Sequence, residues 1–191
     1  MPEETGHIHR PEAVCAPAYL GRAPAIAGEI VKSLAARKKM IAAAESCTAG
    51  LAADFIARIP GASDVFWGSF VTYTIDAKIR MLGVPEDLIK EYGAVSRPVA
   101  LAMAEKALEK SGAFWAFSIT GLAGPAGDGG TPIGTIWIAV AGKDGDTAGN
   151  PRSEAKSFLF LGSRNEVREA AAAAALEELL ERIKGIDNRE V

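Results

Sequence analysis

The chain has 191 residues, of which 49% are hydrophobic and 24% are charged, and this is the composition of an ordinary globular domain. Its formal net charge of −3 argues against a broad basic surface for nucleic acid or for an anionic membrane. Its two cysteines are too few for a disulfide framework and lack the spacing of a zinc site. Neither a membrane-spanning apolar run nor a signal-peptide pattern is visible, so we expect a cytoplasmic protein.

The first 24 residues contain four prolines and both histidines, without apolar periodicity. This pattern predicts a flexible tail over residues 1–24, followed by a single domain over residues 25–186. His7 and His9 have no further ligand at useful spacing, so we expect no metal site there.

Apolar spacing and turn residues predict the following elements in chain order. They are a helix from residue 26 to the basic residues 37–39, a strand over 40–44, a helix over 51–59, a strand over 69–73, a short helix over 75–82, a helical turn after Pro85, a helix from Ser96 to Gly112, strands over 114–119, 134–141 and 155–161, and a last helix that begins at the capping box 163–166.

Helices separate the first three strands, which favours parallel pairing because parallel neighbours need a long crossover. Residues 120–133 are too rich in Gly and Pro for a crossover helix, so we expect a reversal there and a second one over 142–151. The prediction is an α/β fold with a mixed, mostly parallel sheet of five to six strands. The segments after strands one, two, three and five then meet at one edge, where open α/β sheets bind ligands.

The first of these segments, Glu45 to Gly50, leads from a buried strand into a helix. Backbone N–H groups at a helix start can bind an anion or a developing oxyanion, yet Ser46 and Thr48 also fit a simple helix cap. Cys47 has two interpretations: a thiol nucleophile with a lowered pKa, or a small buried side chain.

Both histidines lie in the predicted tail, so a Ser-His-Asp triad is excluded from the core. A nucleophilic Ser46 would need another base, and Lys78, about one helical turn after Tyr73, is the candidate at the same edge. Taken alone, Lys78 also fits a solvated helix position.

A glycine-rich segment, residues 120–130, follows the third strand. It can bring backbone N–H groups close to a phosphate or a carboxamide, although it matches neither a Walker loop nor a dinucleotide fingerprint. A plain hairpin loop is the alternative. Arg164 and Arg168, one turn apart in the last helix, can reach a phosphate or can be ordinary surface residues.

Seven motifs occur in order over about residues 26–183: Ala44 to Leu51, Ile59 to Ser63, Phe70 to Tyr73 with Ala77-Lys78, Leu82 to Val84, Tyr92 to Ser96, Ile119 to Pro125 and Pro132 to Trp137. Together they resemble the CinA C-terminal domain family. The resemblance implies a three-layer α/β/α fold and nicotinamide-nucleotide amidase activity, in which the carboxamide of nicotinamide mononucleotide is hydrolysed to nicotinate mononucleotide and ammonia.

By the same resemblance, Ser46 is the nucleophile, Lys78 the base and Tyr73 a neighbouring hydroxyl. Substrate contacts are expected at Glu45, Cys47, Thr48, Gly50, Thr120, Gly121, Gly124, Arg164 and Arg168. We expect no cofactor and no metal; the expected partner is the small-molecule substrate, with no nucleic acid and no membrane. The alanine-rich stretch 170–175 allows close helix packing, within the fold or in a homo-oligomer.

Family members usually have two glycines after the Ser-Cys-Thr sequence, whereas this chain has Ala49 and Gly50. The extra methyl group favours an alternative in which the pocket belongs to a nucleotide-binding or regulatory module without turnover. A second alternative is a Cys47-dependent enzyme that acts on another amide.

Overall fold

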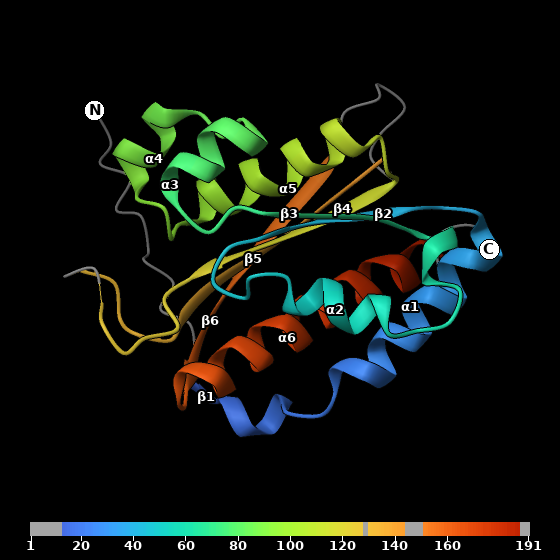
Figure 1. The fold of residues 1–191 in the computed structure, drawn as a ribbon, viewed down its shortest axis with the longest axis horizontal. Coiled ribbons are helices and arrows are strands. Elements are labelled where there is room, and N and C mark those ends of the chain that lie inside the picture. Colours follow the sequence, from blue (N-terminus) through green and yellow to red (C-terminus); the bar gives the residue numbers. More distant parts are fainter. Residues whose placement is uncertain (1–12, 128–129, 144–150, 188–191) are drawn as a thin grey trace, which may run out of the picture.

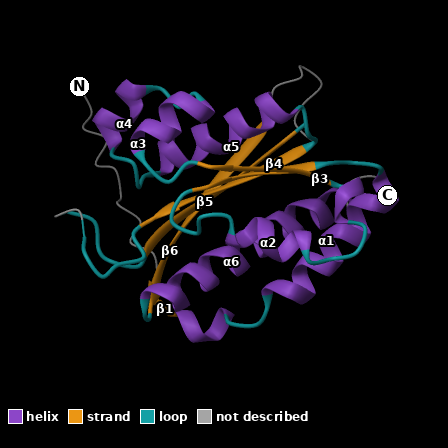
Figure 2. Cartoon of the chain, viewed as in Figure 1, coloured by secondary structure: helices purple, strands orange, loops and turns teal. Residues whose placement is uncertain are grey.

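The computed structural model describes residues 13–127, 130–143 and 151–187. One sheet lies between two helical layers, as Figures 1 and 2 show. The first layer contains α1 (Ala23–Arg37), α2 (Leu51–Ala57) and α6 (Arg164–Asp187). The second contains α3 (Ile75–Ala77), the π-helical segment η3 (Lys78–Leu82), α4 (Glu86–Tyr92) and α5 (Arg97–Ser111). The predicted three-layer α/β/α fold is therefore confirmed.

The sheet has six strands in the order β1-β6-β5-β4-β2-β3. These strands are β1 (Ala13–Cys15), β2 (Ile41–Glu45), β3 (Phe66–Val71), β4 (Trp115–Gly121), β5 (Thr135–Gly142) and β6 (Arg152–Leu161). β2 is parallel to β3 and β4, whereas β5 is antiparallel to both of its neighbours. Both predicted chain reversals are confirmed.

This topology brings the carboxyl ends of separate strands together. Glu45, the last residue of β2, is opposite Val71 of β3 and Ile119 of β4 in the register. β6 runs antiparallel to β5 and so points the same way as β2, β3 and β4. The segments that follow these four strands therefore leave at one edge of the sheet, as the sequence predicts.

The predicted tail is wrong for residues 13–24. β1 pairs in parallel with β6, and the 3-10 helix η1 (Ala16–Tyr19) leads to α1, which begins at Ala23. Ala16 is fully buried, and the ring of Tyr19 packs edge-on against Phe160 at 5.2 Å. Packing against the sheet orders this short segment, and local sequence periodicity carries no signal of it. The histidines of the predicted tail lie outside the described residues.

The core has one cluster on each face of the sheet. Residues 170–175 of α6, all alanine, are buried in the first cluster together with α1 and the apolar side chains of β4 and β5. The second cluster packs α5 onto small residues of β2, β4 and β5. The alanine stretch thus serves close packing within the chain. Among the described helices, none is both long enough and apolar enough to cross a membrane.

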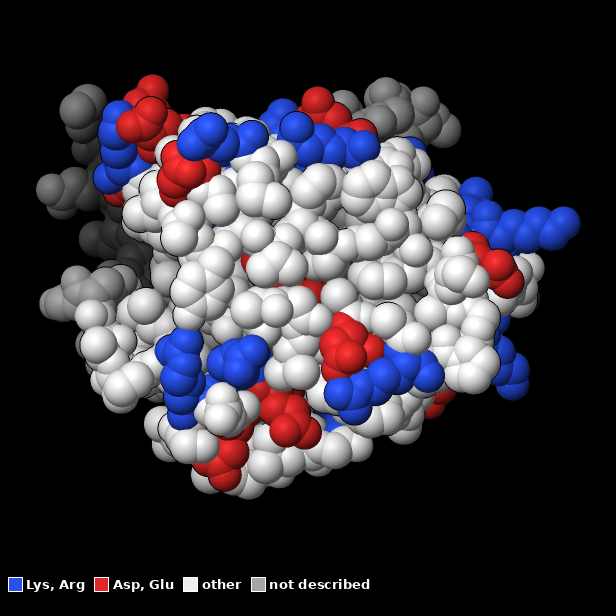
Figure 3. All heavy atoms as spheres, in the orientation of Figure 1, with Lys and Arg blue, Asp and Glu red and all other residues white. Residues whose placement is uncertain are grey.

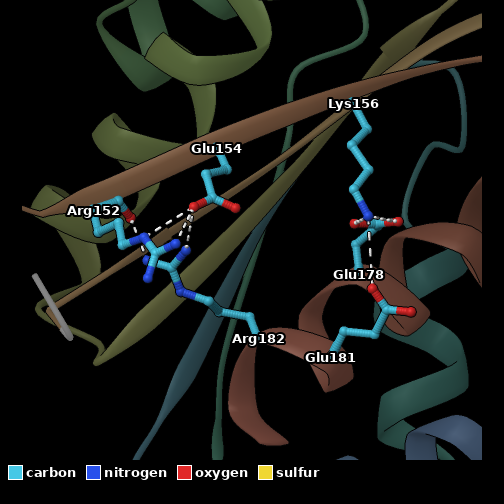
Figure 4. A network of polar contacts seen from close by, with 6 residues as sticks. All are labelled: Arg152, Glu154, Lys156, Glu178, Glu181 and Arg182. Atoms are coloured by element: carbon cyan, nitrogen blue, oxygen red, sulfur yellow. Dashed lines mark hydrogen bonds and ion pairs between the residues drawn. The ribbon is translucent and has the colours of Figure 1, made fainter. Parts of the chain in front are cut away.

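Ion pairs also join α6 to the neighbouring strand β6, as Figure 4 shows. Lys156 lies 2.6 Å from Glu178 and 3.6 Å from Glu181. Arg182 contacts Glu154 at 3.3 Å. These contacts help to fix the orientation of α6, whose first turn contributes side chains to the site described next.

Candidate active site

The site is built around the turn between β2 and α2, residues 46–50. The Ser46 amide donates to the carbonyl of Ile119 at 2.9 Å, so the hydrogen bonding of the sheet continues into the start of the turn. Ala49 and Gly50 then adopt positive φ angles of 53° and 92°. Two successive left-handed residues reverse the chain tightly and lead it into α2.

Lys78 meets Ser46 inside the protein. Its Nζ lies 2.7 Å from Ser46 Oγ and 3.0 Å from the carbonyl oxygen of Thr72, and the residue is only 2% exposed. Burial lowers the pKa of Lys78 to about 8, because desolvation disfavours the ammonium form. Roughly a tenth of the amine is thus neutral at pH 7, far more than for an ordinary lysine, and a neutral amine can accept the proton of the serine hydroxyl.

A local break in helix geometry positions Lys78. The Thr74 side chain caps α3 by accepting from the Ala77 amide at 3.1 Å. Lys78 then opens the π-helical segment η3, which ends at Gly83 with φ 86°. The predicted short helix and its stop at Gly83 are therefore confirmed, with a wider π turn in the second half. Such π turns are frequent at functional sites.

Tyr73 does not present its hydroxyl to Ser46. The side chain is 52% exposed, and its oxygen accepts a hydrogen bond from Arg164 Nη2 at 2.7 Å. The backbone carbonyl of Tyr73 is the group near the serine, 3.5 Å from its Oγ. The contact between Ser46 and Lys78 is consequently direct and does not include the tyrosine hydroxyl.

The two arginines of α6 have different environments. Arg164 binds the Tyr73 hydroxyl and the carbonyl of Gly124, so it bridges two segments that border the site. Arg168 instead donates to the carbonyls of Cys47 at 3.1 Å and Thr48 at 2.9 Å. Figure 3 shows basic side chains over the start of α6, beside a largely uncharged area between the two helical layers.

The start of the glycine-rich segment is partly structural. Thr120 is buried and donates to the carbonyl of Ala94 at 2.8 Å. A Cβ at Gly121 would lie 2.6 Å from the backbone oxygen of Thr135, so only glycine fits there. Gly124, with φ 84°, is the residue of this segment that contacts Arg164. Residues 128–129 lie outside the described part of the chain.

Glu45 and Cys47 are both withdrawn from the site surface. Glu45 has no exposed area, and its carboxylate accepts only from groups of the fold. Burial raises the pKa of Cys47 to about 12, so the thiol is protonated at neutral pH. The structure thus favours the small buried residue over the thiol nucleophile, because desolvation outweighs the nearby cations.

Thr72, unlike the expected substrate contact Thr48, joins the site without a signal in the sequence. The Oγ1 atoms of both are buried without a hydrogen-bond partner among the described residues. The carbonyl of Thr72 holds Lys78, and sequence reasoning missed this backbone role. Across the same ranges, no three His, Cys, Asp or Glu side chains gather as a metal site would require.

Comparisons with known proteins agree with this architecture. The family model described as CinA C-terminal domain matches residues 24–183. A CinA-like protein of Akkermansia muciniphila is 47% identical over 155 residues, which are 80% of this chain and 36% of that protein. A CinA-like protein of Chlorobaculum tepidum is 43% identical over 161 residues, 83% of this chain and 37% of that protein. The chain thus spans a little over a third of the length of these curated relatives.

Solved structures with the same fold cover almost the whole domain. The competence/damage inducible protein CihA from Agrobacterium tumefaciens is 38% identical with a TM-score of 0.76, over 84% of this chain and 95% of that one. The competence damage-inducible protein A (ComA) from Klebsiella pneumoniae is 28% identical with a TM-score of 0.79, over 86% of this chain and 98% of that one.

Proposed function

The chain belongs to the CinA C-terminal domain family, and from this membership and the geometry of Ser46 and Lys78 we propose that it hydrolyses the carboxamide of nicotinamide mononucleotide. The observation that carries the proposal is the 2.7 Å contact between Lys78 Nζ and Ser46 Oγ, both shielded from solvent. A nucleophile within hydrogen-bond reach of a base is the arrangement that covalent amide hydrolysis needs.

In the acylation step, neutral Lys78 takes the proton of the Ser46 hydroxyl as Oγ attacks the carboxamide carbon. The Oγ–C bond forms and the carbonyl oxygen becomes an oxyanion, which backbone N–H groups of the turn bind. When this tetrahedral intermediate collapses, the C–N bond breaks. The Lys78 ammonium returns its proton to the leaving nitrogen, so ammonia departs and an ester on Ser46 remains.

Water completes the reaction. Lys78 removes a proton from the water as its oxygen attacks the ester carbon, and the proton then passes to Ser46 Oγ as nicotinate mononucleotide leaves. The positive charge of the pyridinium ring makes its own carboxamide more electrophilic, so no step calls on a metal or a cofactor. Arg164, at the border of the site, is the arginine best placed to bind the phosphate of the nucleotide.

The two alternatives are less well supported. A thiol mechanism would need a Cys47 thiolate, whereas burial raises the pKa of this residue to about 12. The second alternative, a binding module without turnover, depends on the extra methyl group of Ala49. That residue is exposed and adopts a left-handed φ of 53°, so the turn forms with alanine at this position.

Product analysis tests the proposal. The wild-type protein is incubated with nicotinamide mononucleotide, and both ammonia and nicotinate mononucleotide are measured beside Ser46→Ala and the remote control Ser33→Ala. We expect equal amounts of the two products from the wild type and the control, and a loss of about 10³-fold or more in Ser46→Ala. Bound nucleotide without product in the wild type would refute the enzyme and support the binding module.

A further inference from the structure

The carboxylate of Glu45 occupies the amino end of α2. Its Oε2 accepts from the amides of Gly50 at 3.0 Å and Ala52 at 3.1 Å, and its Oε1 accepts from the Ala53 amide at 3.0 Å and from Ser69 Oγ at 3.2 Å. The N-cap residue Gly50 has no side chain that could satisfy these donors. Glu45 therefore supplies the missing cap, and these helix amides are not available to a ligand.

Arg168 holds the same turn from the carbonyl side. Its Nε and Nη2 donate to the carbonyls of Cys47 and Thr48, while its Nη1 contacts Asn165 Oδ1 at 3.3 Å. A guanidinium group can bind two neighbouring carbonyls at once because its donors form a rigid fork. The turn is consequently fixed by a carboxylate on its amides and by a guanidinium on its carbonyls.

The remaining amides of the turn can now be assigned. The amides of Ser46, Ala49 and Leu51 donate to the carbonyls of Ile119, Ser46 and Thr48, in that order. Gly50 donates to Glu45. Within the described part of the chain, the amides of Cys47 and Thr48 donate to no oxygen, and the Cys47 amide has only its own Sγ as a neighbouring acceptor. These are the two amides directly after the serine that we propose as the nucleophile.

We infer that Glu45 and Arg168 are positioning residues. They hold the turn so that the amides of Cys47 and Thr48 together bind the oxyanion. This inference rests on the proposed function, because the pair is useful only if Ser46 attacks a carbonyl carbon. Glu45 takes up the competing amides of the helix start. Arg168 fixes the peptide plane of the Thr48 amide through the carbonyl of Cys47, and the next plane through the carbonyl of Thr48.

Arg168 has an electrostatic role as well. The carbonyl of Cys47 and the amide of Thr48 belong to one trans peptide group, so they lie in one plane and point in opposite directions within it. A cation bound to the carbonyl polarises the peptide and makes the amide on the far side a stronger donor. The positive charge thus acts on the oxyanion through the peptide, without contact between Arg168 and the substrate.

Steady-state kinetics test this division of roles in Glu45→Gln, Arg168→Gln and Arg168→Lys. We expect kcat to fall roughly 10²-fold in the two Gln variants with KM within about threefold, because an oxyanion exists only in the transition state. Arg168→Lys keeps the charge but loses the fork, so it should recover part of the loss. The exposed pair on α2 provides the controls Asp54→Asn and Arg58→Gln, which should behave as wild type.

Calorimetry separates positioning from substrate contact. Nicotinamide mononucleotide is titrated into Ser46→Ala and into Ser46→Ala combined with Arg168→Gln. Equal dissociation constants support the inference, and a weakening of tenfold or more would identify Arg168 as a direct substrate contact and overturn it. If Glu45→Gln fails to fold, Ser69→Ala removes one of the four hydrogen bonds to the same carboxylate and is expected to lower kcat severalfold.

A fluorophosphonate probe distinguishes failure of this inference from failure of the proposed function. Ser46 Oγ bonds to phosphorus as fluoride leaves and Lys78 takes the proton, and the resulting P–O oxygen lies where the oxyanion would form. Labelling of the wild type and slower labelling of Arg168→Gln, measured by mass spectrometry, support the inference even if the nucleotide is not hydrolysed. Equal labelling rates would overturn it even if the nucleotide is a substrate.

Discussion

Lys78 Nζ lies 2.7 Å from Ser46 Oγ, although the two residues are 32 positions apart in the chain and belong to segments that follow different strands. The contact exists because β2 and β3 are parallel neighbours, so both segments leave the sheet at the same edge. Burial gives the contact its chemical meaning, since it lowers the pKa of the lysine to about 8.

The pH dependence of the reaction should report Lys78. Below pH 8 the protonated amine cannot accept the serine proton, so kcat/KM is expected to rise about tenfold per pH unit and to level off above pH 8 to 9. The profile is measured from pH 6 to 10 with nicotinamide mononucleotide. A rate that is flat or falls across pH 8 would contradict the role of Lys78 as base.

Lys78→Met should be inactive but more stable at pH 7. The pKa of Lys78 is about 8 in the folded protein and about 10.4 in an unfolded chain, so the unfolded chain binds more protons between these values. The cost of burying the lysine is therefore fully present below pH 8 and disappears as the pH rises towards 10.4.

Chemical denaturation of this variant is measured at both ends of that pH window. We expect Lys78→Met to gain about 1–2 kcal/mol at pH 7 after the loss of two hydrogen bonds, and to lose this advantage by about pH 10. Lys90→Met removes an exposed lysine and is the control, with little change at either pH. A destabilised Lys78→Met at pH 7 would show that the lysine is buried without such a cost.

Cys47→Ala should retain activity within about threefold. The thiol is buried with a pKa of about 12, so it is not a nucleophile, and the variant loses only a small side chain from the core at a cost of about 1 kcal/mol. Initial rates and thermal unfolding check this expectation. A loss of activity comparable to that of Ser46→Ala would instead support the thiol mechanism.

Ala49→Gly should keep or increase stability, by up to about 1 kcal/mol, because Ala49 has a φ of 53° and glycine adopts this conformation without steric strain. Ala53→Gly is the matched control within α2, where the same change should cost about 1 kcal/mol. Both are compared by urea denaturation. If Ala49→Gly destabilises as much as the control, strain at this turn is absent.

The sequence predicts the strand pattern, both chain reversals and the edge where the site lies, because these depend on apolar runs and on the glycine-rich breaks between them. It does not predict β1, since a three-residue strand has no periodicity and depends on pairing with β6. Element boundaries also differ: β3 begins at Phe66 and not at residue 69.

Within the site, residue types suggest the participants but not their hydrogen bonds. Ser46 and Lys78 are identifiable because a core without histidine leaves few bases for a serine. The hydrogen-bond partners of Tyr73 and Arg168 cannot be predicted from the sequence. Each residue has several possible partners at the same edge, and only the three-dimensional packing selects among them. The Tyr73 hydroxyl faces Arg164, and Arg168 faces backbone carbonyls.

Trapping the covalent intermediate shows whether an ester forms on Ser46 with Lys78 as the base. Wild-type protein is mixed with nicotinamide mononucleotide at pH 8.5 (about half a unit above the pKa of Lys78), quenched with acid at short times and analysed by peptide mass spectrometry. We expect a nicotinate mononucleotide acyl group on Ser46, absent from Ser46→Ala and strongly reduced in Lys78→Met. Product formation with the acyl group on Cys47, or undiminished turnover by Ser46→Ala, would contradict this mechanism.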